Sequence, residues 1–192
     1  MQNSLLFISS ISQALISALD RLLGWGYPIL YNGIGVISIL LQFMVFQMKH
    51  KRKIVFVGIA SDFGWLSYFA LQGDFISGTA SIIGIMSKIV ILLQEKHAWA
   101  KSKAWNVFFV VFATGFALAT FQAWMDIFAL IASALSISAF FMKDENAIRK
   151  VALLSFCAFA CNSISKVYVV ALIADVTAIL SCIVALLRYK KR

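Results

Sequence analysis

Three ionisable side chains lie inside long apolar stretches of the sequence: Asp62, Lys88 and Asp175. At the centre of a membrane-spanning helix a charge costs about 2.5–3.5 kcal/mol on insertion scales, so such a residue usually has a partner or faces water. Asp62 and Lys88 either form an ion pair between adjacent helices, or Lys88 extends its ammonium group to the membrane surface. A role for Lys88 in binding a substrate or an anion is the third interpretation.

Asp175 and several polar or aromatic residues are the other candidates for solute contacts. An intramembrane aspartate can accept hydrogen bonds from hydroxyl groups, bind a cation or take up a proton, or it can simply be bonded to neighbouring helices. Trp65 and Tyr68 predict either an interfacial aromatic belt or a stacking wall above a site. Asn162 either lines a path or bonds across helices. Weaker candidates of the same kind are Ser38 and Gln42.

The sequence contains no recognisable catalytic or metal-binding set. It has no HExxH motif, no glycine loop that would cradle phosphate and no obvious nucleophile–base pair. The cysteines lie in apolar segments without CxxC spacing, which argues against a zinc site or a disulfide framework. We therefore expect neither an enzyme nor a bound cofactor or metal.

The elements that must position these residues are membrane-spanning helices. Hydrophobic residues make up 62% of the 192 residues, charged residues 13%, and the mean hydropathy is +0.91. Because a spanning helix needs roughly 20 apolar residues, seven such helices account for nearly the whole chain. The amphipathic pattern of residues 4–23 predicts an additional helix in the membrane interface rather than a signal peptide. The expected spanning segments are 29–47, 54–71, 75–94, 104–121, 124–142, 148–165 and 168–188.

The cations are concentrated in alternate loops. The formal net charge is +9, and 14 of the 17 Lys and Arg residues fall in three loops and the C-terminal tail. This alternation predicts that the basic loops and the C-terminus are cytoplasmic and that the N-terminus is outside. The same placement argues against nucleic acid as a partner. The basic segments run from Lys49 to Lys53, from Lys96 to Lys103, from Lys143 to Lys150 and from Arg188 to Arg192.

An internal repeat groups the helices. Sliding the chain along itself by about 94 residues aligns it without gaps, and residues 87–93 then share five identities with residues 181–187. The repeat predicts three helices, a linker helix and three helices, with the two units parallel. The expected parts are an interfacial helix at 1–28, a first unit at 29–95, a linker at 96–123 and a second unit with a basic tail at 124–192.

This layout resembles that of the SWEET, PQ-loop and PnuC transporters. The run Trp65-Leu66-Ser67-Tyr68 followed by Asp74 looks like the junction between the second and third helices of a SWEET unit, and Trp124-Met125-Asp126 resembles PnuC. In SWEET units the third helix supplies a polar side chain to the substrate site. Since the repeat places Ser81 on Asp175, the resemblance implies that these two residues face each other across a central site.

A closer resemblance is to the YgjV family of bacterial inner-membrane proteins. That family has a similar length, a basic residue at the position of Lys88, and an acidic residue and a final arginine at the positions of Asp175 and Arg188. The chain departs from SWEET proteins in lacking a hinge proline within the expected first helix of each unit, since its only proline, Pro28, precedes the expected segment 29–47. Glycines such as Gly58 and Gly84 are the available weak points if the first unit bends.

Together these features predict a carrier in the bacterial inner membrane. It would be a facilitator or a proton-coupled transporter of a small polar molecule such as a sugar, vitamin or nucleoside. The alternative is a non-transporting scaffold or regulator of the same fold, whose basic face holds anionic lipid or a partner. The expected partners are a small polar solute and membrane lipid, and a homo-oligomer is left open.

Overall fold

The residues that the structure describes form helices joined by short loops. The computed structural model describes residues 17–18, 21–72, 75–119, 124–165 and 169–189, and no strand occurs among them. The all-α prediction is thus confirmed, whereas the predicted interfacial helix lies mostly outside the described residues. The elements are α2 (Gly26–Gln47), α3 (Lys51–Gln72), α4 (Phe75–Leu93), the short 3-10 helix η1 (Trp99–Lys101), α5 (Ala104–Ala119), α6 (Asp126–Phe141), α7 (Glu145–Ser165) and α8 (Val169–Arg188).

Four of these helices are long and apolar enough to cross a membrane: α2, α3, α7 and α8. Only 22% to 33% of their apolar windows is buried inside the protein, so most of their hydrophobic surface points outward, as lipid permits. The described part of α4, together with α5 and α6, forms shorter apolar helices. The 16 residues of α5 or α6 extend about 24 Å, against a hydrocarbon core roughly 30 Å thick.

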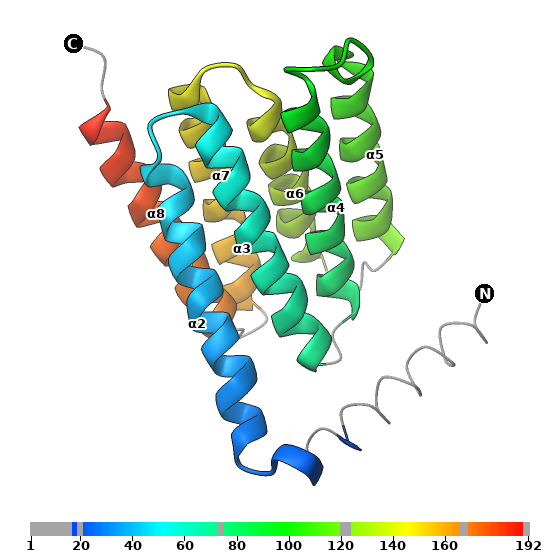
Figure 1. Ribbon diagram of the computed structural model, residues 1–192, viewed down its shortest axis with the longest axis vertical. Coiled ribbons are helices and arrows are strands. Elements are labelled where there is room, and N and C mark those ends of the chain that lie inside the picture. The colour runs from blue at the N-terminus through cyan, green and yellow to red at the C-terminus, as the bar shows by residue number, and fades with distance from the viewer. Residues whose placement is uncertain (1–16, 19–20, 73–74, 120–123, 166–168, 190–192) are drawn as a thin grey trace.

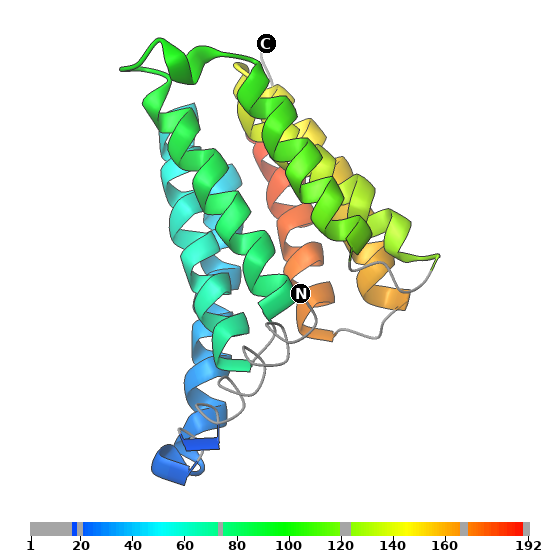
Figure 2. The same ribbon diagram turned by 90° about the vertical axis from the view of Figure 1, so that its right-hand side faces the viewer.

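The helices pack in an order that is the same in the two halves of the chain. Helix α3 packs between α2 and α4, and α7 packs between α6 and α8. Helix α5 packs on α6, and the two groups are joined by the contact between α2 and α8 and by smaller contacts of α4 with α5 and α6. In Figure 2, α2, α3 and α4 lie on one side, and α5, α6 and α7 lie on the other.

The basic loops gather at one end of the bundle. The links α2–α3, α4–α5 and α6–α7 all lie at the end where α8 finishes, at the top of Figure 1. We call this the basic end. A hydrophobic cluster near it draws residues from α2, α3, α4, α6, α7 and α8 and includes Phe46 of α2, Ile54 and Val55 of α3, Phe140 of α6 and Ile148 of α7. The two groups of helices are therefore packed against each other in this half of the bundle.

Candidate functional site

A buried ion pair lies where α3, α4 and α6 meet. Lys88 Nζ of α4 is 2.5 Å from Asp62 Oδ2 of α3, and the exposed fractions of the two side chains are 8% and 19%. The ammonium group also lies 4.4 Å from the ring centroid of Phe140 on α6, a cation–π distance. Lys88 therefore forms the ion pair between adjacent helices, and its ammonium group does not extend to the surface.

Two glycines make room for this ion pair. Gly58 precedes Asp62 by four residues on α3, and Gly84 precedes Lys88 by four residues on α4. A Cβ on Gly58 would lie 2.9 Å from Lys88 Cε, and one on Gly84 would lie 2.6 Å from Asp62 Oδ2. Each charged side chain thus lies against the glycine of the facing helix. The sequence indicated these glycines only as points of bending, but α3 and α4 continue through them and use them for close approach.

Asp175 belongs to a different helix contact. It lies on α8, is 7% exposed, and accepts a hydrogen bond of 2.8 Å from Ser163 Oγ of α7. Ser81 is half-buried on α4, in the other group of helices. The two intramembrane carboxylates therefore have separate partners, Lys88 for Asp62 and Ser163 for Asp175. The facing arrangement of Ser81 and Asp175 across a central site remains a prediction.

The structure brings together three of the candidates, Trp65, Gln42 and Tyr68, in the first group of helices. Trp65 Nε1 donates a hydrogen bond of 2.7 Å to Gln42 Oε1, which links α3 to α2. Trp65 also packs edge-on against Tyr68, with ring centroids 5.6 Å apart. The two aromatic rings thus lie side by side, with the Gln42 amide bonded to one of them. This arrangement fits both an interfacial aromatic belt and a stacking wall above a site.

The remaining two candidates differ in how their polar atoms are satisfied. Ser38 is fully buried and donates to the carbonyl of Ile34 in its own helix, and its hydroxyl fills the space that a Cβ on Gly64 would need. Ser38 therefore serves close packing of α2 on α3. Asn162 is half-buried on α7, and its Oδ1 has no hydrogen-bond partner among the described residues.

Arg149 is a buried residue that the sequence analysis counted in the basic loop from Lys143 to Lys150, although it also falls in the expected segment 148–165. It is 1% exposed, because α7 begins at Glu145 and its second turn faces α2. Its Nε donates to the carbonyl of Phe46 at 3.1 Å and its Nη2 to that of Met48 at 2.7 Å. The loop interpretation of Arg149 was wrong. The repeat carried a signal, since it aligns Arg149 with Val55, which is fully buried.

Further hydrogen bonds extend the Arg149 contact to α8. Arg149 Nη1 donates to Asn146 Oδ1 at 2.8 Å, and its guanidinium carbon lies 4.7 Å from the ring centroid of Tyr189. The Tyr189 hydroxyl donates to the carbonyl of Gln47 at 2.9 Å, and Gln47 Nε2 donates to the carbonyl of Ser181 at 2.9 Å. This network satisfies the last carbonyls of α2 and ties α2 to α7 and α8 at the basic end.

A metal centre is not indicated by the described residues, in which no three His, Cys, Asp or Glu side chains gather in a way that could hold an ion.

Comparison with known proteins gives a match to one protein family. The sequence model of the family Imp-YgjV, described as "Bacterial inner membrane protein", matches residues 29–192. The curated proteins and the solved structures give no match.

Proposed function

This chain belongs to the Imp-YgjV family of bacterial inner membrane proteins, and we propose that it transports a small polar solute across that membrane. The observation that carries the proposal is the ion pair of Lys88 and Asp62. Burying two charges costs several kcal/mol per ion before their attraction offsets it, so a hydrophobic pair would hold α3 and α4 together at least as well. Charges at such a position typically mark a substrate or ion path.

The proposed architecture is seven spanning helices arranged as three, one and three, of the SWEET and PnuC kind. The identical packing order of α2–α3–α4 and α6–α7–α8 supports two parallel units, with α5 as the linker. The short helices α5 and α6 would span by thinning the bilayer locally. The gathering of the basic loops at one end supports a cytoplasmic C-terminus and an outside N-terminus.

In this proposal the ion pair lies where the two units can separate. Lys88 and Asp62 belong to the first unit, whereas Phe140, which covers the ammonium group, belongs to the second. Movement of α6 away from α4 would open the ammonium group to water and to a polar solute. Asp62 could then exchange its partner for a solute hydroxyl or a proton, which leaves both facilitated and proton-coupled transport within the proposal.

The Arg149 network would hold the basic end closed during this step. It joins α2 of the first unit to α7 and α8 of the second through backbone carbonyls. Since two units that rock about a midplane site must separate at each end in turn, opening toward the cytoplasm requires these bonds to break.

Uptake into proteoliposomes tests the proposal. The purified chain would be reconstituted and offered radiolabelled hexoses, nucleosides and water-soluble vitamins, with empty liposomes as the baseline. We expect at least one of these solutes to enter faster with the protein, and Lys88→Gln to reduce that rate at least tenfold. Lys53→Gln is the matched control, because Lys53 is exposed on the first turn of α3. Unchanged flux in Asp175→Asn and Ser81→Ala would remove those residues from the site.

A second candidate is a non-transporting scaffold, which the dense cations of the basic end favour. In that case no solute would enter the liposomes or stabilise the purified protein, and a detergent extract would yield a defined complex with a partner held by the basic end.

A further inference from the structure

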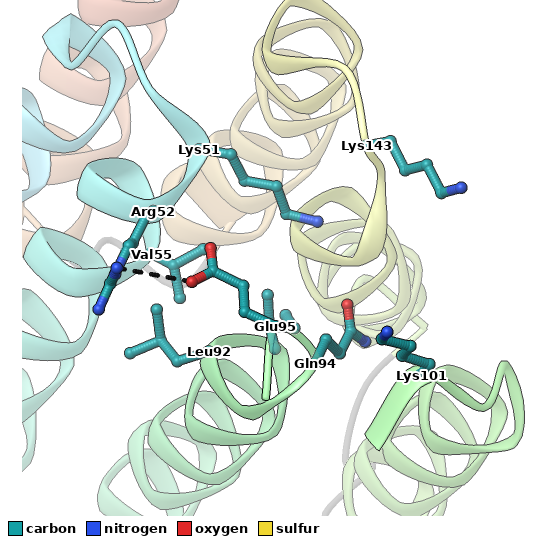
Figure 3. Close-up of a pocket in the computed structure, with 9 residues that line it drawn as sticks. Lys51, Arg52, Val55, Leu92, Gln94, Glu95, Lys101 and Lys143 are labelled. Carbon is teal, nitrogen blue, oxygen red and sulfur yellow. Dashed lines mark ion pairs between the residues drawn. The ribbon is translucent and has the colours of Figure 1, made fainter. Parts of the chain in front are cut away.

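A pocket of about 460 Å³ opens at the basic end, between segments that are far apart in the sequence. Lys51 and Arg52 line it from the first turn of α3, Lys101 lines it from η1, and Lys143 lines it from the α6–α7 link. Figure 3 shows Lys51 extending across the space, Lys101 beside Gln94, and Lys143 at the rim. We call this the basic pocket.

The residues that line the basic pocket include four cations and one carboxylate. Its single carboxylate, Glu95, lies 3.6 Å from Arg52, and this pair is exposed to solvent. The ammonium groups of Lys51, Lys101 and Lys143 form no ion pair within the described part of the chain. Like charges held around one cavity repel one another, and a bound anion would reverse that repulsion.

The position of α3 adds to this imbalance. Its first turn contains cations and no acidic residue, and the partial positive charge of its N-terminus is met by one carboxylate from another helix, because Lys51 N donates a hydrogen bond of 3.4 Å to Glu145 Oε1 of α7. The floor of the basic pocket is apolar, with the buried residues Val55 and Ile91 beneath the cationic rim. A ligand seated there would exchange water for apolar contact on one side while its charge met the lysines on the other.

We propose that the basic pocket binds a phosphate-bearing anion, which is the headgroup of an anionic lipid or a soluble phosphorylated molecule. Lysines act as point charges toward phosphate, and several of them arranged around a cavity suit a tetrahedral group with charge on several oxygens. The pocket volume of about 460 Å³ lies within the range of small-ligand sites. This proposal does not depend on transport, since a scaffold could carry the same site.

Stabilisation of the whole purified chain by added ligand tests whether the basic pocket binds phosphate. The midpoint of thermal unfolding in a neutral detergent would be followed against inorganic phosphate at constant ionic strength, with chloride as the reference. A second arm would use dioctanoyl phosphatidylglycerol against dioctanoyl phosphatidylcholine. A ligand that binds only the folded protein raises the midpoint in proportion to the logarithm of its concentration over its Kd.

The pocket variant is the double substitution Lys51→Gln and Lys101→Gln. The matched control is Lys49→Gln and Lys96→Gln, which removes the same charge from exposed positions at the same end that do not line the pocket. The single variant Lys101→Gln alters one exposed side chain of η1 and provides a folded pocket variant if the double one does not fold.

We expect Kd to rise about fivefold for each pocket lysine removed and about 30-fold for the double variant. The control should stay within about twofold of the wild type. Stabilisation by inorganic phosphate would identify a soluble ligand, and stabilisation by phosphatidylglycerol alone would identify a lipid headgroup. Equal weakening in the pocket variant and the control would overturn the proposal in favour of diffuse attraction, and so would the absence of any shift with either probe.

Discussion

The ion pair of Lys88 and Asp62 makes a quantitative prediction about stability. Substituting Lys88 by Met removes the ammonium group but keeps a flexible apolar chain over Gly58, so the packing of α4 on α3 is preserved. The Asp62 carboxylate, which has a 19% exposed side chain, then loses its partner. Removing one member of a buried ion pair typically costs about 3–5 kcal/mol. We expect a loss within this range.

Asp62→Asn should be destabilising for the complementary reason, since it leaves the ammonium group of Lys88 with only the ring of Phe140. The double variant removes both charges and should unfold within about 1 kcal/mol of the wild type, because replacing a whole buried pair is often nearly neutral. The double-mutant cycle therefore predicts a coupling free energy of several kcal/mol between the two side chains.

Equilibrium unfolding of the purified chain by sodium dodecyl sulfate in mixed micelles would give these free energies, with helix content followed by circular dichroism. The exposed Lys53→Met serves as the control and should change stability by less than about 0.5 kcal/mol. Additive effects of the two single variants, with coupling below about 0.5 kcal/mol, would refute the reasoning.

Four further substitutions test other helix contacts, with the same unfolding measurement. Gly84→Ala should cost about 1–3 kcal/mol, because its Cβ would lie 2.6 Å from Asp62 Oδ2. A Cβ on Gly33 would have no neighbour within 4 Å, so Gly33→Ala should instead stabilise the protein by about 0.5–1 kcal/mol. Loss of stability in both variants would contradict the role of Gly84 in the close approach of α3 and α4. Arg149→Met should cost at least about 3 kcal/mol, since two buried carbonyls of α2 lose charged donors, and a cost below 1 kcal/mol would show that the network is dispensable. Ser163→Ala should cost about 1 kcal/mol through its bond to Asp175, and no change would mean that Asp175 has other support.

Hydrophobic segments and loop charges predicted the features that depend on composition. Lipid requires long apolar helices whatever their neighbours are, so the sequence indicated an all-helical chain with its cations at alternate loops. The ion pair between Lys88 and Asp62 was also within reach, because an intramembrane charge needs a partner and adjacent helices are the first place to look.

Features that depend on the rotation of one helix against another were not predictable in the same way. The opposition of Gly58 and Lys88, and of Gly84 and Asp62, follows from the face that each helix turns toward its neighbour. Hydropathy does not encode that face when a helix is apolar all round. Arg149 was counted among the loop cations although it falls within the expected segment 148–165, because charge alone cannot distinguish a loop cation from one that caps a neighbouring helix.

Solute flux through the purified protein is the most direct test of the transporter proposal. Reconstituted wild-type chain should take up at least one solute among labelled hexoses, nucleosides and vitamins above empty liposomes. Lys88→Gln should lower that uptake at least tenfold, while Lys53→Gln leaves it unchanged. Uptake equal to that of empty liposomes for every solute, from protein that is folded by circular dichroism, would contradict a transporter of these classes.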